Sequence, residues 1–295
     1  MKAIRRKRQF SVFDIVVCII LGFFALLIVI PFLNVIVVSF TTQKEYATST
    51  FLLFPHNPTL ENYKQMFADD RILIGYRTTT LLLLLGVPIN LLLTTSLAYG
   101  LNRKGYPGRK FIFLFVLFTM IFNGGIIPLY LVMKSLQLIN TIWSVVLAYG
   151  VNTFYMIIMC NYFSTLPESL IESAKLDGAG EWMILFKIIL PISAPIIATI
   201  TLFYTVDRWN EWYNAMIFIR DNNLQPLQME LRSIVIDSQV LQTLQSTGAA
   251  TIQNQNFIDG MKMCAVIVTM LPVMCVFPFL QKYFVKGMLI GAIKS

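Results

Sequence analysis

The sequence has only one histidine, His56, and few charged residues, and these shortages exclude several classes of protein. Charged residues make up 13% of the 295 residues, whereas soluble domains carry about a quarter. Hydrophobic residues make up 57%, which indicates a multispanning membrane protein. A single histidine excludes a multi-histidine metal site. The four cysteines show neither metal-ligand nor disulfide spacing and lie in apolar stretches, at Cys18, Cys160, Cys264 and Cys275. We therefore predict no metal site.

A phosphate-binding loop is also missing. No Gly-x4-Gly-Lys-Ser/Thr pattern occurs, and Gly178-Ala179-Gly180 is not followed by a lysine–hydroxyl pair. The chain is therefore not expected to hydrolyse ATP. The net charge of +8 lies beside apolar segments, which favours membrane topology and anionic lipid over nucleic acid as its explanation.

Six apolar segments reach the roughly 20 residues that a helical membrane span requires. They cover residues 13–40, 73–101, 111–133, 142–163, 196–219 and 263–284. The first is too long for a signal peptide and lacks a small-residue cleavage site, so we expect an uncleaved anchor. The sequence thus predicts an all-α integral membrane protein with six transmembrane helices.

Basic residues indicate the orientation of these spans. Lysines and arginines cluster at residues 5–8, at residues 103–110 between the second and third spans, and at residues 282–294. With six spans all three clusters fall on one side, which the positive-inside rule makes cytoplasmic. We predict a multi-pass protein of the bacterial cytoplasmic membrane with both termini in the cytoplasm. Residues 220–261 then form an external loop, either a functional cap or a disordered connector.

The loop at residues 164–191 falls on the cytoplasmic side and has the pattern of a helix-turn-helix. Thr165 and Glu168 form a capping-box pattern, and Asp177-Gly178 is a helix stop. A second helix then carries an apolar stripe expected to anchor it to the bundle, at Trp182, Leu185, Phe186 and Ile189. On pattern alone, an ordinary amphipathic interfacial helix explains the loop as well.

One motif within this loop has a specific parallel. Glu172-Ser173-Ala174, three residues, Gly178, nine residues and Ile188-Ile189-Leu190-Pro191 resemble the coupling-loop signature of ATP-binding-cassette (ABC) importer permeases. That signature reads Glu-Ala-Ala, three residues, Gly, nine residues, Ile-x-Leu-Pro, so Ser173 replaces one alanine. The resemblance implies the type I importer permease fold with a cytoplasmic coupling helix-turn-helix. The residues that it implies in ATPase coupling are Glu172, Ala174, Asp177, Gly178, Trp182, Leu190 and Pro191.

Other stretches are similar to the maltose-type, carbohydrate branch of that family. They are residues 96–101, 123–128, 208–212 and 281–288. This resemblance implies a second, non-identical permease subunit, an ATPase dimer that binds ATP and Mg, an extracellular sugar-binding protein, and no cofactor in this chain. It also implies a basic cytoplasmic N-terminus at 1–12 and a permease domain at 13–295. That domain has a core at 73–284 and a cytoplasmic tail at 285–295.

Polar and aromatic residues in the fourth and fifth spans are candidates for a sugar path. Asp207 and Glu211 are expected to share a helix face, with Arg208 bridging to Glu211. Aromatic platforms beside amides and carboxylates suit sugars. The candidates are Asn152, Tyr155, Arg208, Trp209, Asn210, Glu211, Trp212 and Tyr213. The alternatives are an interfacial aromatic belt and charges that hold a permease dimer together.

These observations predict a non-catalytic permease subunit of an ATP-driven oligosaccharide importer that forms half of the pore. An importer of another solute, such as glycerol phosphate or a peptide, is a second possibility. A gradient-driven secondary transporter is a rival from another class, and it would require inverted repeats that the sequence does not show.

Overall fold

The computed structural model describes residues 12–48, 52, 54–246 and 258–292, and all regular structure in these ranges is helical. The chain divides into two compact units. The first comprises Met1–Ala68 and Ile234–Met270, and the second Asp69–Ser233 and Leu271–Ser295. The basic cluster at residues 5–8 lies outside the described residues.

The first unit contains α1 (Val12–Ser39), α2 (Gln43–Thr48), α3 (Glu61–Phe67) and parts of α14 (Leu227–Ser246) and α15 (Ile258–Ala292). The buried amide of Asn62 fastens α3 to the end of α1, because its Nδ2 donates to the carbonyls of Ser39 and Thr41, both at 3.0 Å. The sequence predicted a loop across 220–261, but α14 occupies much of it. The predicted tail at 285–295 is largely helical, since α15 extends to Ala292.

The second unit contains the elements between residues 69 and 233. Its longer helices are α4 (Arg71–Asn102), α5 (Arg109–Ile121), α6 (Ile126–Ser135), α8 (Thr153–Phe163), α9 (Ser169–Leu176) and α12 (Ala194–Trp209). Its shorter elements are α7 (Ile142–Ala148), α10 (Glu181–Ile184), the π-helix η1 (Leu185–Ile189), α11 (Leu190–Ile192), α13 (Tyr213–Phe218) and η2 (Asn222–Leu224).

Within the described residues, three helices are long and apolar enough to cross a membrane as single rods: α1, α4 and the Ile258–Val276 part of α15. Three further spans are possible if each bent helix pair crosses once. These pairs are α5 with α6 (117°), α7 with α8 (53°), and residues 181–192 with α12 (89°). The predicted single helices at 111–133 and 142–163 are therefore each broken into two. The fifth predicted helix, 196–219, ends at Trp209, where the Asn210 side chain folds back to donate to the Val206 carbonyl at 2.9 Å.

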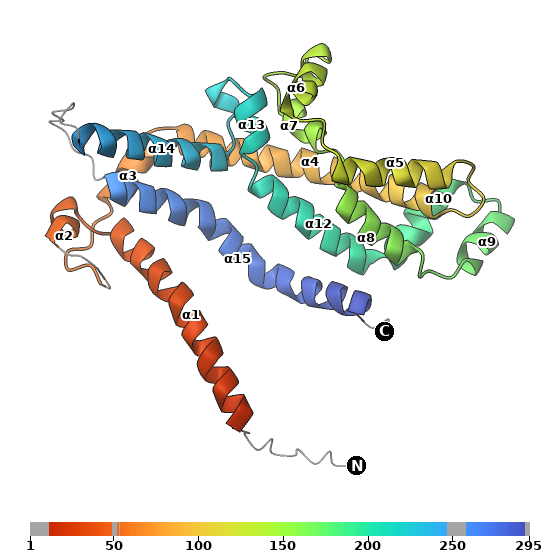
Figure 1. The fold of residues 1–295 in the computed structure, drawn as a ribbon, viewed down its shortest axis with the longest axis horizontal. Coiled ribbons are helices and arrows are strands. Elements are labelled where there is room, and N and C mark those ends of the chain that lie inside the picture. The colour runs from red at the N-terminus through yellow and green to blue at the C-terminus, as the bar shows by residue number, and fades with distance from the viewer. Residues whose placement is uncertain (1–11, 49–51, 53, 247–257, 293–295) are drawn as a thin grey trace. The chain divides into compact units, whose positions relative to one another are not determined.

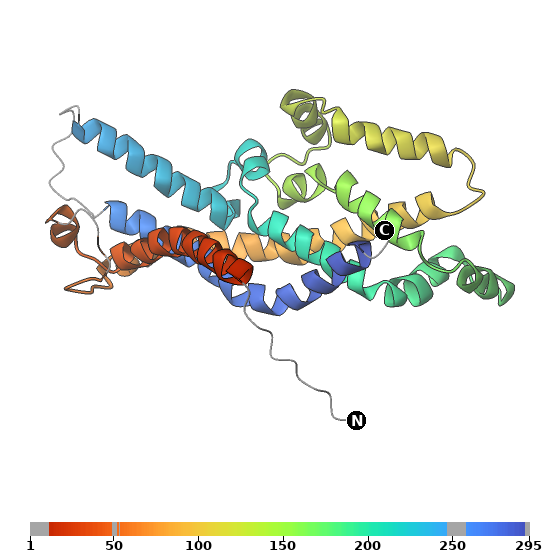
Figure 2. The same ribbon diagram turned by 60° about the horizontal axis from the view of Figure 1, so that its bottom comes forward.

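The core of the second unit is formed where α4, α8 and α12 pack together. Its fully buried members include Ala98 of α4, Met156 and Met159 of α8, and Ile200 of α12. In Figures 1 and 2, α9 and α10 lie beyond the ends of α8 and α12, on the side away from α13. The 164–191 loop is thus mounted at one end of this core.

Candidate functional site

The turn at Gly178 is the best-defined feature of the 164–191 loop. Helix α9 ends at Leu176, and Gly178 takes a left-handed φ of 80°. The Ala179 amide donates to the Ala174 carbonyl at 2.9 Å, and the Gly178 amide donates to the Lys175 carbonyl at 3.0 Å. These two bonds form a Schellman motif, which satisfies carbonyls that the end of a helix leaves unpaired. The helix stop predicted at Asp177-Gly178 is confirmed.

The start of α9 differs from the capping box that the sequence predicted. The Thr165 hydroxyl donates to the Tyr162 carbonyl at 2.7 Å, so it completes the end of α8 and does not cap α9. Glu168 stands at the N-cap position without a side-chain capping bond and forms an ion pair with Lys104. The capping-box prediction was therefore wrong. The Glu168 carboxylate pairs with Lys104, between α4 and α5, and does not bond to the backbone at the start of α9.

The second helix of the loop contains a π-helical turn, which changes which of its apolar side chains face the core. The Leu190 amide donates to the Leu185 carbonyl, an i to i+5 bond. Five-residue spacing buries Ile184 and Ile189 together with Leu185, all at most 1% exposed. Trp182 and Phe186 instead stack on each other with ring centroids 6.0 Å apart and are 65% and 46% exposed. The prediction that these two rings anchor the loop was wrong, because a helix with 3.6 residues per turn was assumed.

The buried residues of the loop belong to the core of α4, α8 and α12. Ala174, Ile184, Leu185 and Ile189 form one cluster with residues of those three helices. Leu190 packs against this cluster, and Pro191 begins the short α11 before the 89° bend into α12. The coupling candidates Glu172, Asp177 and Gly178 are exposed. The loop therefore has an exposed polar side and a side continuous with the core.

A second attachment is polar and centres on Glu181, at the start of α10. The Tyr99 hydroxyl donates to Glu181 Oε2 at 2.5 Å, and Arg103 Nη2 lies 3.3 Å from Oε1. Lys175 Nζ also lies 2.7 Å from Oε1. We call Tyr99, Arg103, Lys175 and Glu181 the Glu181 cluster. It joins the end of α4, the end of α9 and the start of α10.

The charge state of Glu181 follows from these contacts. Burial raises the pKa of Glu181, but the hydrogen bonds from Lys175 and Tyr99 and the charge of Arg103 outweigh that effect, so its pKa lies below the ordinary value. Glu181 is therefore ionised at neutral pH. Arg103 was predicted only as part of the basic cluster that sets the topology, and Glu181 was not among the predicted site residues. The Arg103–Glu181 contact could have been suspected from the sequence. Glu181 begins the second helix of the loop, and the basic turn at residues 103–110 is predicted on the same side of the membrane.

Among the path candidates, Arg208 is the most deeply buried, at 2% exposure. Its guanidinium donates to the carbonyls of Val145 (2.9 Å), Val146 (2.8 Å) and Tyr149 (3.2 Å). Val145 and Val146 lie in the last turn of α7, where carbonyls have no helical partner and the helix dipole favours a cation. Arg208 thus satisfies the backbone where α7 and α8 break, as a membrane interior requires.

Two further contacts fix Arg208 in place. Its Nε donates to Asn90 Oδ1 of α4 at 3.1 Å, and Nη1 lies 3.7 Å from Glu211 Oε2, as the i, i+3 spacing predicted. A Cβ on Gly86 would lie only 3.0 Å from Arg208 Nε, so α4 leaves room for the arginine there. All of its polar contacts are internal. Arg208 therefore acts as a structural clamp in this arrangement.

Asp207 and Glu211 do not share a helix face, contrary to the prediction. Helix α12 ends at Trp209, so the i, i+4 relation does not extend to Glu211. Glu211 is turned inward and accepts bonds from the amide and side chain of Asn214. Asp207 is exposed and accepts the Tyr155 hydroxyl at 2.9 Å. The two carboxylates therefore have separate roles.

A polar group lies where α8 begins. Asn152 caps α8 by accepting from the amides of Phe154 (3.0 Å) and Tyr155 (3.3 Å). The Asn152 amide donates to the Tyr204 hydroxyl at 3.0 Å, and that hydroxyl also pairs with Thr94 at 2.6 Å. Asn152 is thus committed to structure, which leaves the Tyr155–Asp207 pair as the accessible part of this group.

The remaining candidates surround the break after α12. Asn210 and Tyr213 are exposed, and Trp209 and Trp212 are partly buried. Arg232 lies over the Trp212 ring at 4.0 Å from its centroid. The structure thus assigns internal bonds to Arg208, which is buried, and to Asn152 and Glu211, which are partly buried, and it leaves Asn210 and Tyr213 exposed near the end of α12.

Comparison with known proteins shows which family this chain belongs to. The family described as "Binding-protein-dependent transport system inner membrane component" matches residues 5–290. Protein LplC of Bacillus subtilis is 40% identical over 285 residues, covering 96% of this chain and 95% of the relative. The polygalacturonan/rhamnogalacturonan transport system permease protein YtcP of the same organism is 39% identical over 284 residues, covering 96% and 98%.

A solved structure shows the same fold. A chain of a bacterial ABC transporter involved in the import of the acidic polysaccharide alginate matches with a TM-score of 0.83 and 28% identity. The match covers 94% of this chain and all of that chain. The type I permease fold predicted from the sequence is confirmed.

Proposed function

We propose that this chain, which belongs to the family of binding-protein-dependent transport system inner membrane components, is the non-catalytic permease subunit of an ATP-driven oligosaccharide importer. The observation that carries the mechanism is the double attachment of the 164–191 loop. Its buried side is part of the core of α4, α8 and α12, and the Glu181 cluster ties it to the end of α4.

In this proposal, the ATP and Mg are bound by a separate ATPase dimer that grips the exposed side of the loop at Glu172, Asp177 and Gly178. The Schellman turn makes this end of the loop a short, defined element. A displacement of the loop would move α4, α8 and α12 together, because a packed core transmits displacement and does not absorb it. A second, non-identical permease subunit would supply the other half of the pore.

The side of the membrane follows from the charges. The turn between α4 and α5 carries Arg103, Lys104, Arg109 and Lys110 and lies beside the loop. The positive-inside rule assigns such a turn to the cytoplasm, where ATP is available. The other end of α4 and α13 would then face the binding protein on which the family's transport depends, which in this proposal is extracellular and binds sugar.

The proposed substrate class rests on two observations. Relatives carry names of polygalacturonan, rhamnogalacturonan and arabinooligosaccharide transport systems. The accessible groups near the end of α12 combine an exposed carboxylate, Asp207, with the hydroxyl of Tyr155 and the rings of Trp212 and Tyr213. Hydroxyl-binding groups beside aromatic faces are what a sugar chain requires.

The test is reconstitution of the chain with its second permease, ATPase and binding protein in liposomes. Uptake of labelled oligogalacturonides, alginate oligosaccharides, arabino-oligosaccharides and maltodextrins is measured with ATP inside. We expect at least one oligosaccharide to be accumulated and to stimulate ATP hydrolysis. Uptake by the permease subunits alone, driven by an ion gradient and indifferent to ATP, would overturn the proposal in favour of secondary transport.

A further inference from the structure

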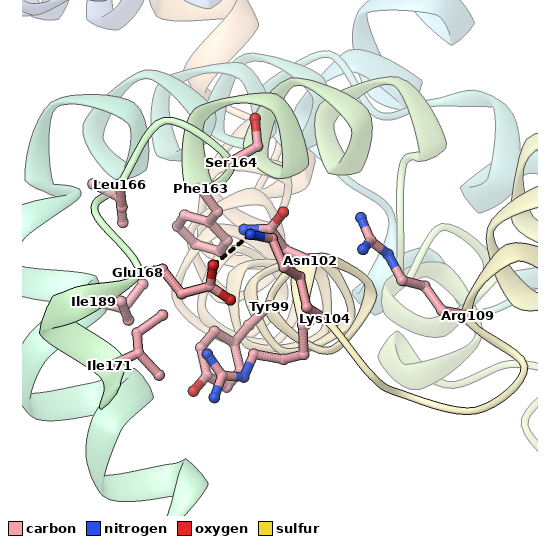
Figure 3. Close-up of a pocket in the computed structure, with 11 residues that line it drawn as sticks. Tyr99, Asn102, Lys104, Arg109, Phe163, Ser164, Leu166, Glu168, Ile171 and Ile189 are labelled. Carbon is pink, nitrogen blue, oxygen red and sulfur yellow. Dashed lines mark hydrogen bonds and ion pairs between the residues drawn. The ribbon is translucent and has the colours of Figure 1, made fainter. Parts of the chain in front are cut away.

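A cavity of about 350 Å³ lies where α4 ends, α5 begins and α8 leads into α9. Figure 3 shows its lining, with Lys104 reaching Glu168, Asn102 beside Phe163, and Arg109 apart from them at the start of α5. The cavity touches the coupling loop and shares Tyr99 and Arg103 with the Glu181 cluster. A ligand in this cavity would contact both the α4–α5 region and the loop.

The charge in this cavity is mainly positive. Arg103, Lys104 and Arg109 line it, and Glu168 is the carboxylate in the lining. Glu168 pairs with Lys104, and Arg103 contacts Glu181 from the neighbouring cluster. Arg109 is half-buried at the first turn of α5, and no hydrogen bond or ion pair of its side chain is found within the described chain. A half-buried guanidinium of this kind favours an anion with oxygen acceptors.

The side-chain amide of Asn102 is a second polar group in the cavity that has no hydrogen-bond partner among the described residues. The side chain is half-buried. Its amide can donate two hydrogen bonds. Arg109 and Asn102 together therefore offer donors on the wall formed by the ends of α4 and α5. This distinguishes the cavity from the neighbouring one beside Trp182, whose cations Arg103, Lys104 and Lys175 are already paired with carboxylates.

The side of the cavity formed by the end of α8, the coupling loop and η1 is partly apolar. Phe163, Leu166, Ile171 and Ile189 line it, together with Ser164 and with Glu168, whose charge is paired with Lys104. A free inorganic anion has no apolar surface to bury against these side chains. The glycerol and upper acyl chain of a phospholipid would bury apolar surface there, which is favourable. The cavity thus combines donors on one side with a hydrocarbon surface on the other.

The position of the cavity matches the headgroup level of a bilayer. It lies at the ends of three membrane helices or half-spans, α4, α5 and α8. Tyr106 and Phe111, close in sequence to Arg109, are 53% and 74% exposed, as is typical of aromatic residues at a membrane interface. Basic pockets between membrane helices on the cytoplasmic side bind anionic headgroups.

We propose that this cavity binds the phosphodiester headgroup of an anionic phospholipid, with Arg109 and Asn102 as the principal donors. The phosphate chemistry is shared by free phosphate, but the apolar wall and the membrane level favour the lipid. A bound lipid would bridge the α4–α5 turn and the α8–α9 link. It would therefore hold the base of the coupling loop beside the Glu181 cluster, two of whose members, Tyr99 and Arg103, also line the cavity.

The proposal is tested on the purified full chain in detergent, without its partners, so that the outcome does not depend on the importer function. The delipidated protein is titrated with dioleoylphosphatidylglycerol or dioleoylphosphatidylcholine, and bound lipid is counted by native mass spectrometry. We expect phosphatidylglycerol to bind preferentially. Arg109→Gln should weaken it by roughly fivefold or more, the effect of one cation at a lipid surface.

The matched control is Lys110→Gln, which removes the same charge one residue further on, at an exposed position outside the lining. It should retain wild-type preference. Asn102→Ala keeps every charge and should also weaken binding, so the proposal does not depend on Arg109→Gln folding. Equal losses in Arg109→Gln and Lys110→Gln, or no preference for phosphatidylglycerol, would refute the site. Displacement of the lipid by millimolar inorganic phosphate would refute the lipid as its ligand.

Discussion

Replacing Arg208 with methionine tests how the broken helix pair α7–α8 is held in the membrane. The change removes a buried cation and leaves the carbonyls of Val145 and Val146 without the Arg208 donor, whereas the Tyr149 carbonyl keeps its bond from the Asn90 side-chain amide. It also leaves Glu211, with a side chain only 10% exposed, without its counter-charge. Removing one partner of a buried ion pair costs about 3–5 kcal/mol. We expect Arg208→Met to lower the free energy of unfolding by that amount.

The assay is unfolding of the purified chain in mixed micelles by sodium dodecyl sulfate, followed by circular dichroism. Arg220→Met is the matched control, because Arg220 is exposed and makes one 3.2 Å side-chain bond to the Tyr130 hydroxyl. Its cost should stay below about 1 kcal/mol. Adding Glu211→Gln to Arg208→Met should recover part of the loss, since the unpaired carboxylate is then neutral. A loss for Arg208→Met no larger than that of the control would refute the clamp.

Three further changes test the coupling loop and the packing around Arg208. Glu181→Gln should leave ATP hydrolysis in place but reduce the sugar transported per ATP, because the loop loses its ionic tie to α4; an unchanged ratio would contradict this role. Gly178→Ala should destabilise the protein by about 1 kcal/mol through its φ of 80°, whereas Gly180→Ala, at φ −73°, should not. Equal effects in thermal unfolding would show that the turn is not strained. Gly86→Ala should cost about 1–3 kcal/mol, because its Cβ meets Arg208 at 3.0 Å, while Gly100→Ala, with open space around it, should be neutral or stabilising. A neutral Gly86→Ala in the same unfolding assay would mean that Arg208 is free to shift.

Local patterns in the sequence were sufficient for much of the fold. The predicted spans 13–40 and 73–101 correspond closely to α1 and α4, because long apolar runs determine such helices. The stop at Gly178 was predictable, because a left-handed helix end favours glycine. The family signature then supplied the type of fold.

Features that depend on non-local contacts could not be predicted. The π-turn that exposes Trp182 and Phe186 is a departure from regular helix that hydrophobic periodicity does not reveal. Glu181 bonds to Tyr99, 82 residues earlier, so their proximity follows only from the packed core. The same holds for Arg208, whose carbonyl partners in α7 lie about 60 positions away in the sequence. Composition could indicate that this arginine faces protein, but not which groups it satisfies.

The most direct test of the central claim is a crosslink between the loop and an ATPase subunit. Leu176, 89% exposed at the end of α9, is replaced with cysteine. The control position is Phe54, 77% exposed between the first two predicted spans, a segment that six spans place on the extracellular side. Membranes that contain the assembled importer, in which the four native cysteines of this chain are replaced with serine, are treated with a short reagent that joins a thiol to a lysine amine. We expect Leu176→Cys to crosslink to the ATPase and sugar uptake to stop, while Phe54→Cys gives no ATPase crosslink and transports normally. Absence of the crosslink at Leu176, or uptake that is unaffected by it, would contradict the account.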